Sequence, residues 1–172
     1  MIFRIIVWVV MLFGGVAGGY YLDYIYFNGI HNNWKFHLIS FIIGVWLLRI
    51  VMKISRNTGR TLAKYGRKGD VPRLDTNILV TQGPYRFMRH PMHLGLLLFP
   101  LAIAFLVGSP SFILLIAPLE IIFMLVMIKL VEEPEAKKKF GKQYEDYIKD
   151  KPWFCLRKEC INELLRDVPK EK

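Results

Sequence analysis

Four long apolar runs, separated by polar segments, constrain the fold of this chain more than any other feature. A helix needs about 20 mostly apolar residues to cross the hydrocarbon core of a bilayer. The third run is short and contains Pro100, so we expect it to be kinked, tilted or begun early at Pro91. The pattern predicts an all-α integral membrane protein with about four transmembrane helices. The runs cover approximately residues 2–27, 34–54, 93–107 and 111–131.

The segments around these runs indicate how they are connected. A tight Gly-Ser-Pro-Ser turn at residues 108–111 makes runs three and four an antiparallel hairpin. The first run begins like a secretory signal peptide, with Arg4 before an apolar stretch. Apolar and aromatic residues continue past the small residues at 16–19, so we expect an uncleaved helix. The length of 172 residues indicates a single domain.

The basic residues are unevenly distributed and predict an orientation. The net charge is +10, yet the turn between runs one and two has only Lys35, at the very start of run two. By the positive-inside rule, both termini and the long middle segment are expected in the cytoplasm. Because the charges flank apolar runs, we expect them to meet anionic lipid, with no nucleic-acid partner. Nine lie between runs two and three: Lys53, Arg56, Arg60, Lys64, Arg67, Lys68, Arg73, Arg86 and Arg89. Eleven follow Glu132: Lys137, Lys138, Lys139, Lys142, Lys149, Lys151, Arg157, Lys158, Arg166, Lys170 and Lys172.

The two cysteines, Cys155 and Cys160, both lie in the polar C-terminal tail. A C-x4-C pair with no further cysteine and no nearby histidine lacks the four ligands of a structural zinc site. We therefore expect no metal site. In a cytoplasmic tail, two reduced thiols are the expected state.

A basic turn precedes the third run. Pro91 suits the first position of a helix, where its missing N–H costs nothing, and His90 would then be the cap. The positive end of the helix dipole, next to Arg86 and Arg89, favours a carboxylate or a phosphate. Taken alone, the same residues could simply contact lipid headgroups while His90 caps the helix.

An acidic pair, Glu132 and Glu133, ends the fourth run on the same side of the membrane. Carboxylates at an anionic lipid surface are poor anchors, which favours a role in a site. Lys129 lies one turn before Glu133 and either adds a cation or pairs with it. A basic cluster facing an acidic pair suits a zwitterionic amino-acid group.

Three sequence blocks resemble one family of membrane enzymes. They are LVTQGPYRFMRHPMHLG at residues 79–95, EEP at 132–134 and FGKQYEDY at 140–147. In this order they are similar to the isoprenylcysteine carboxyl methyltransferase and phospholipid methyltransferase superfamily, whose members use S-adenosylmethionine. The similarity covers about residues 75–154. It implies a cofactor-binding half there. The apolar runs predict two N-terminal helices within residues 1–54, and a polar tail follows at 155–172.

The resemblance also implies roles for individual residues. The first block would hold the cofactor, Glu132 and Glu133 would close the pocket, and two tail aromatics would fold over it. His93 stands where the family usually has tyrosine, and only histidine titrates near neutral pH. The first-block residues are Gly83, Tyr85, Arg89, His90 and Pro91, and the tail aromatics are Tyr144 and Tyr147.

Three charged residues within the apolar runs need separate interpretations. Glu120 is near the middle of the fourth run, where a carboxylate faces either a cavity or a hydrogen-bonding neighbour. It could contact substrate or accept a proton, or it could only join helices. Asp23 and Arg49 are nearer the ends of their helices, where snorkelling to the interface explains them.

The tail after Pro134 predicts an amphipathic helix with its apolar positions on one face. Such a helix could lie on the bilayer surface, cover a site at the cytoplasmic face, or do both. Its apolar face holds Ala136, Phe140, Tyr144, Tyr147 and Ile148.

We expect a membrane methyltransferase that moves a methyl group from S-adenosylmethionine to a lipophilic acceptor entering from the bilayer. A prenylated-cysteine carboxylate, a phospholipid amine and a small thiol all remain open as acceptors. Only an amine must lose a proton before attack, with Glu120 or His93 as the base. The alternatives are an NADPH-dependent reductase related to sterol reductases, and a non-enzymatic transporter or adaptor.

Overall fold

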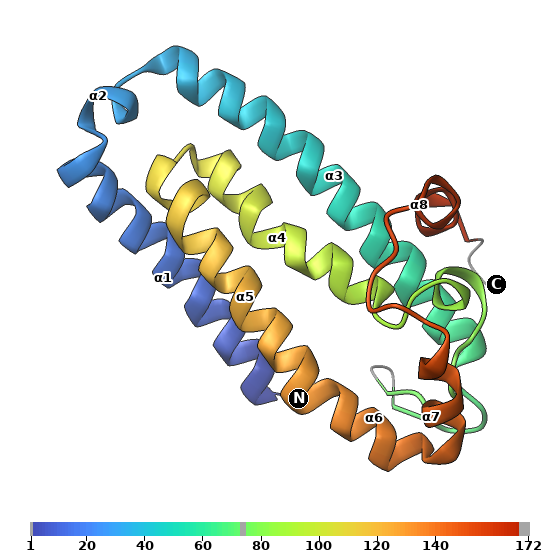
Figure 1. Cartoon of the computed structure of the whole chain (residues 1–172). Helices are drawn as coiled ribbons and strands as arrows, with labels where there is room; N and C mark the ends of the chain where they lie inside the picture. Colours follow the sequence, from blue (N-terminus) through green and yellow to red (C-terminus); the bar gives the residue numbers. More distant parts are fainter. Residues whose placement is uncertain (1, 73–74, 169–172) are drawn as a thin grey trace. The chain divides into compact units, whose positions relative to one another are not determined.

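The structure is a computed structural model that describes residues 2–72 and 75–168, and the described residues form helices and loops without strands (Figure 1). Arg73, Lys170 and Lys172, which the charge count above includes, lie outside the described residues. The elements in chain order are α1 (Ile2–Tyr26), α2 (Asn28–His31), α3 (Trp34–Tyr65), η1 (Gly83–Arg86), α4 (Pro91–Val107), η2 (Phe112–Ile116), α5 (Ala117–Met127), η3 (Ile128–Glu132), α6 (Glu133–Phe140), α7 (Lys142–Lys149) and α8 (Lys158–Leu165).

The expected all-α membrane fold is confirmed. Three helical stretches in the described part of the chain are long and apolar enough to cross a bilayer: Ile6–Tyr26, Trp34–Tyr65 and Phe112–Phe140. The fourth expected helix is present as the apolar α4, which is shorter and begins at Pro91. Large apolar side chains on the long helices face outward, including Phe13, Trp46 and Leu119, as lipid contact requires.

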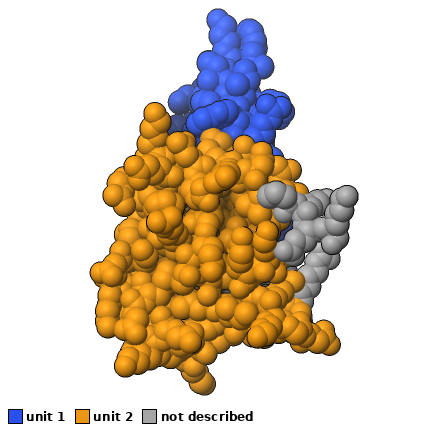
Figure 2. Space-filling view, turned by 90° about the vertical axis from the view of Figure 1, so that its right-hand side faces the viewer, with its two compact units in different colours: residues 1–49, 97–126 blue, residues 50–96, 127–172 orange. Residues whose placement is uncertain are grey.

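The chain divides into two compact units, coloured separately in Figure 2. Unit 1 comprises residues 1–49 and 97–126, and unit 2 comprises residues 50–96 and 127–172.

In unit 1, α1 packs against η2. The contact includes a stripe of α1 residues spaced four apart, Gly15 and Gly19. A Cβ at Gly15 would lie 2.7 Å from Cζ of Phe112, and one at Gly19 would lie 2.6 Å from Oγ of Ser109. Both glycines therefore let the two backbones approach more closely than any larger residue allows. Such close approach is how helices associate in lipid, where apolar burial gives little driving force between them.

Asp23 continues this stripe one turn further and corrects the snorkelling prediction for this residue. Its side chain is fully buried, and one carboxylate oxygen accepts a 2.7 Å hydrogen bond from the backbone N–H of Ser111. Asp23 thus caps the start of the helix on the neighbouring segment, where its negative charge meets the positive end of the helix dipole. Arg49, in contrast, is exposed as expected.

Two wide turns of π-helix interrupt the helical stretch 112–140, and each precedes a proline. Proline lacks the N–H and crowds the carbonyl four residues earlier. That carbonyl belongs to Leu114 for Pro118 and to Leu130 for Pro134, and both leucines lie within the wide turns. The wider hydrogen-bonding pattern removes the conflict, so the helix continues through both prolines.

In unit 2, α3 continues to Tyr65, well past the end of the apolar run near residue 54. The buried face of this extension is polar, and its side chains donate hydrogen bonds to backbone carbonyls. Thr58 and Thr61 donate to backbone carbonyls one turn earlier, and Asn57 donates to the carbonyl of Leu164 at 3.3 Å. Hydrophobic patterning alone cannot detect such a helix.

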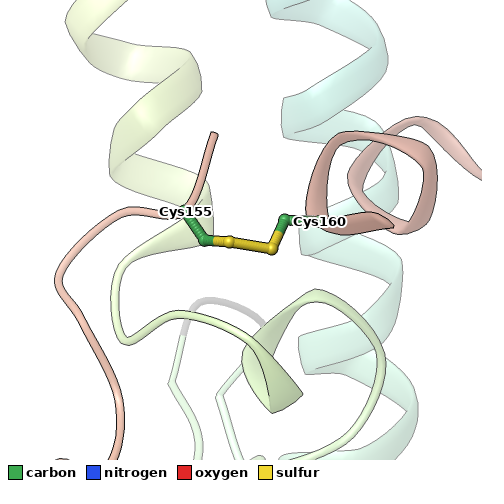
Figure 3. Close-up of a disulfide and its surroundings, with 2 residues drawn as sticks. All are labelled: Cys155 and Cys160. Atoms are coloured by element: carbon green, nitrogen blue, oxygen red, sulfur yellow. A yellow bond between two sulfur atoms is a disulfide. The ribbon is translucent and has the colours of Figure 1, made fainter. Parts of the chain in front are cut away.

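The tail of unit 2 corrects two expectations. The single amphipathic helix is broken into α6 and α7 by Gly141, whose φ of +54° favours glycine. The expected pair of reduced thiols is wrong as well, because Cys155 and Cys160 form a disulfide (Figure 3). Folding brings the two cysteines together by starting α8 at Lys158, between them.

The glycine stripe generates a stability prediction with a matched control. Gly19→Ala should lower the free energy of unfolding by about 1–3 kcal/mol, since the added methyl overlaps neighbouring atoms. Gly14 lies on the same helix with nothing within 4 Å of an added Cβ, so Gly14→Ala should leave stability unchanged or slightly raised. Thermal unfolding in detergent, followed by tryptophan fluorescence, measures both. Equal losses in the two variants would show that the stripe does not hold α1.

Candidate functional site

The turn before α4 presents the first block of predicted site residues. Its 3-10 helix, η1, starts at Gly83, whose φ of +57° suits glycine. A Cβ at Gly83 would approach Cγ2 of Thr61 to 3.3 Å, so this turn also packs closely on α3. Pro84 and Tyr85 are buried in the turn. Pro91 is the first residue of α4, as predicted. Residues 87–90 therefore form a short connection between η1 and α4.

A buried ion pair joins this block to the acidic pair. Nη1 of Arg89 donates to Oε1 of Glu133 at 2.6 Å, and the two side chains are 18% and 15% exposed. Nε2 of His90 lies 3.4 Å from the same oxygen. The structure thus brings together the basic and acidic groups that the sequence predicts to face each other.

An extended segment between α7 and α8, residues 151–157 and here called the strap, runs against the same block. The backbone N–H groups of Arg89 and His90 donate to the carbonyls of Pro152 and Trp153 at 3.0 and 3.2 Å. Nε of Arg89 also donates to the carbonyl of Lys151 at 2.7 Å. The strap therefore fixes both the backbone and the guanidinium of Arg89.

Two tyrosines of α7 approach the block from the tail. The hydroxyl of Tyr147 lies 2.6 Å from the carbonyl oxygen of Tyr85 and 3.0 Å from that of Met88. Tyr147 therefore holds the backbone of the turn. Tyr144 is buried, and its hydroxyl has no hydrogen-bond partner within the described part of the chain.

Around these groups unit 2 contains a cavity of about 210 Å³. Apolar side chains from α3, from the loop before η1 and from α6 form most of its wall, while charged and polar groups form one end. The cavity is thus amphipathic, with room for a flat apolar group next to a polar one. The apolar wall includes Leu62, Ile78, Leu79, Val80, Ala136 and Phe140; the polar end includes Arg89, His90, Glu132, Tyr85, Tyr144 and Tyr147.

The positions of the predicted site residues relative to this cavity fall into two groups. The six polar-end residues all line it. Glu133 reaches the site through its ion pair, and Pro91 is buried at the start of α4. His93 is partly buried, its ring 5.4 Å from that of His90. Gly83 shapes the turn, and Lys129 and Arg86 are exposed. None of these six is among the lining residues.

Sequence reasoning missed the wall formed by residues 76–80 and Leu62. These residues lie in the stretch between the second and third apolar runs, where the charge pattern indicates only a basic cytoplasmic segment. The one signal in the sequence is the apolar triplet Ile78, Leu79 and Val80, which overlaps the start of the first block. Lys139 of α6 pairs with Asp75 at the edge of this wall, and the ammonium lowers the pKa of the Asp75 carboxyl.

Burial sets the protonation of the polar groups. Desolvation and the neighbouring His93 lower the pKa of His90 to about 4, so its ring is neutral at pH 7. A carboxylate only accepts hydrogen bonds, which assigns the ring proton to Nε2 facing Glu133. Burial, and then the charge of Glu133, raise the pKa of Tyr144 to about 12. Burial also raises the pKa of Tyr85 and Tyr147, so the three hydroxyls remain donors at neutral pH.

Glu120 belongs to unit 1 and is not among the residues that line the cavity of unit 2. Its side chain is 5% exposed, and Oε2 is buried without a hydrogen-bond partner among the described residues. The other oxygen would lie 2.9 Å from a Cβ at Gly15, so the carboxyl packs against the close-approach stripe of α1. A buried carboxylate with an unsatisfied oxygen is costly, which supports a role beyond packing.

Comparison with known proteins identifies the family. The profile of the phospholipid methyltransferase family matches residues 35–143, more than half of the chain. The match includes the turn, Arg89, His90 and the acidic pair, which the structure joins. No curated protein and no solved structure matches the chain. Among the described residues, no group of three or more histidine, cysteine, aspartate or glutamate side chains could hold a metal ion. The chain belongs to the phospholipid methyltransferase family and is a membrane methyltransferase.

Proposed function

We propose that the cavity of unit 2 binds S-adenosylmethionine and that the protein methylates a lipid-borne acceptor. The observation that carries the proposal is the hydroxyl of Tyr144. It is buried, lacks a partner among the described residues and belongs to a residue that lines the cavity. A buried polar atom left without a partner costs free energy, and a ligand that bonds it removes that cost.

The lining fits this cofactor in its chemistry. The apolar wall suits an adenine ring, and the polar end suits the methionyl head, which carries both a carboxylate and an ammonium. Arg89 is the cation for the carboxylate, while Glu132 is the carboxylate for the ammonium. The cavity of about 210 Å³ is below the roughly 300–1,000 Å³ usual for ligand sites, so binding has to widen it.

When bound, S-adenosylmethionine supplies a methyl group already activated on a sulfonium. The work of the chain is then to bind, to align and to exclude water. Tyr147 contributes by holding the turn, since its hydroxyl bonds two of the turn's carbonyls. Tyr144 and Phe140, on the two sides of Gly141, cover the cavity from the tail. This favours the interpretation in which the tail helices cover the site.

We propose that the acceptor is a lipid amine and that Glu120 is the base that deprotonates it. An amine is protonated at neutral pH and must lose a proton before it attacks, whereas a carboxylate or thiolate needs no base. Glu120 is a buried carboxylate in a membrane-spanning stretch, and its unsatisfied oxygen can accept that proton. His93, partly buried beside His90, is the second candidate base.

We also propose that the cofactor site and both termini face the cytoplasm. The support is the distribution of basic residues, nine and eleven on one side against Lys35 on the other. The site block and the acidic pair belong to the basic side.

The cofactor prediction uses two tyrosines of α7 as a matched pair. Tyr144→Phe removes only an unpaired hydroxyl, so the fold should be unaffected while affinity for S-adenosylhomocysteine falls about tenfold, as expected for a lost ligand hydrogen bond. Tyr147→Phe removes bonds to the turn and should lower the melting temperature as well. Calorimetry and thermal unfolding measure the two effects. Unchanged affinity in Tyr144→Phe, or tighter binding of NADPH than of S-adenosylhomocysteine by the wild type, would count against the proposal.

The acceptor prediction uses Glu120→Gln, which keeps the size of the side chain and removes the base. With phosphatidylethanolamine as acceptor, kcat should collapse while affinity for S-adenosylhomocysteine is retained. With a prenylated-cysteine carboxylate, the substitution should be mild. Methyl transfer from labelled cofactor, with helix content checked by circular dichroism, measures both. Normal turnover of the amine by the variant would remove Glu120 from the mechanism.

The orientation prediction uses introduced cysteines, since the native pair is joined in a disulfide. Asn33 and Lys138 are both exposed and lie on the predicted opposite sides of the membrane. In intact cells, a membrane-impermeant thiol reagent should label Asn33→Cys, and it should label Lys138→Cys only after the cells are opened. The reverse pattern would refute the orientation.

A further inference from the structure

The disulfide packs against the backbone segment that leads into Arg89 and His90, because it is in one cluster with Met88. Cys155 belongs to the end of the strap and Cys160 to α8 (Figure 3). Both are buried, and with the fully buried Met88 they form one apolar cluster against which Phe87 and Leu94 pack. Met88 is the residue immediately before Arg89, so the cluster and the ion pair share one short piece of backbone.

The two cysteines differ in how their surroundings are anchored. α8 is held to α3 independently of the disulfide. Asn57 donates to the carbonyl of Leu164, which is 2% exposed, and Arg60 donates to the carbonyl of Val168 at 2.7 Å. The strap has no helix of its own, and three of its carbonyls hold it to the site.

Those carbonyls are the strap's contribution to the site. Lys151 accepts from the guanidinium of Arg89, and Pro152 and Trp153 accept from the backbone N–H groups of Arg89 and His90. The rings of His90 and Trp153 also meet edge to face, with centroids 6.2 Å apart. If the strap moves, the donors that orient Arg89 and His90 lose their partners.

We propose that the Cys155–Cys160 disulfide is a positioning device for the cofactor site, and that cofactor affinity is redox-dependent. The bond ties the strap to the anchored α8 and thereby keeps the three carbonyls on Arg89 and His90. Opening it frees the strap and raises the conformational entropy of the segment that must be ordered for binding. The inference rests on the proposed function.

The redox step is a thiol–disulfide exchange. One thiolate of a dithiol reductant attacks a cysteine sulfur and forms a mixed disulfide with it, while the S–S bond breaks and the other cysteine leaves as a thiol. The second thiol of the reductant then attacks the mixed disulfide and releases the first cysteine. Two electrons and two protons pass to the protein, which gains two thiols, while the reductant becomes a cyclic disulfide. In the cytoplasm, where the proposed orientation puts the tail, disulfides are usually transient and redox-sensing.

The test compares oxidised and dithiothreitol-reduced wild-type protein, with the redox state verified by the mass of the alkylated chain. In the reduced protein the backbone amides of Arg89 and His90 should exchange hydrogen faster. The KM for S-adenosylmethionine should rise roughly fivefold or more, the lower range of coupling between linked sites. The kcat at saturating cofactor should be retained, because the groups that meet the acceptor are unchanged.

The matched control is the Cys155→Ala/Cys160→Ala variant, which contains no cysteine. It should resemble the reduced wild type and should not respond to dithiothreitol. Unchanged exchange and unchanged KM in verified reduced protein would overturn the proposal, as would faster exchange with an unchanged KM. Loss of helix content on reduction would also overturn it, because the bond would then hold the fold. Failure of the oxidised protein to bind S-adenosylhomocysteine would instead remove the proposed function, and this inference with it.

Discussion

The contact between Arg89 and Glu133 is the interaction on which the rest of unit 2 depends. Both side chains are mostly buried, and a buried charge is tolerated only when it is paired and hydrogen-bonded. Breaking such a pair by removing one partner typically costs about 3–5 kcal/mol. The surrounding elements supply what the pair needs. The strap accepts a second hydrogen bond from Arg89, and neutral His90 donates to Glu133.

Because the pair is complete within the chain, a ligand meets a site that is already electrically balanced. In the proposed complex, the carboxylate of the ligand competes with Glu133 for the guanidinium of Arg89, while its ammonium lies at the acidic pair, Glu132 and Glu133. A zwitterion satisfies both partners at once, whereas a plain anion leaves Glu133 without its cation. The proposed site would therefore discriminate between ligands by their charge pattern rather than by their net charge, because the wrong pattern leaves a buried charge unpaired.

The transmembrane helices could be predicted from the sequence because lipid imposes a simple rule of length and polarity. The same rule fails where polar side chains are buried. The extension of α3 to Tyr65 has Asn57, Thr58 and Thr61 on its buried face. Asn57 donates to a carbonyl 107 residues away, a partner that no local pattern reveals, while the two threonines bond carbonyls one turn earlier in the same helix. The snorkelling prediction for Asp23 fails for a similar reason, since its partner is a backbone N–H 88 residues away.

The polar end of the cavity could be predicted as well, because charged residues near a membrane are few and their types indicate their chemistry. The apolar wall could not, since Leu62 and Val80 look like any other aliphatic residues in a sequence. The disulfide could not be predicted from the sequence either. Its formation depends on α8 folding the chain back after Cys155, and the expected compartment argued for free thiols.

The wide turn at residues 128–132 determines how the chain tolerates the deletion of a single residue. A π turn carries one more residue than an α turn, so it is equivalent to a single-residue insertion in the helix. Removing that residue would rotate everything after it by about 100°, the angle per residue of an α-helix. Glu133 follows the turn immediately, so it would then point away from Arg89 without any change in its identity. The direction in which Glu133 points thus depends on the number of residues in the turn and not only on the residue types. A variant of this chain that lacks one residue of the turn would keep both glutamates and still lose the contact with Arg89.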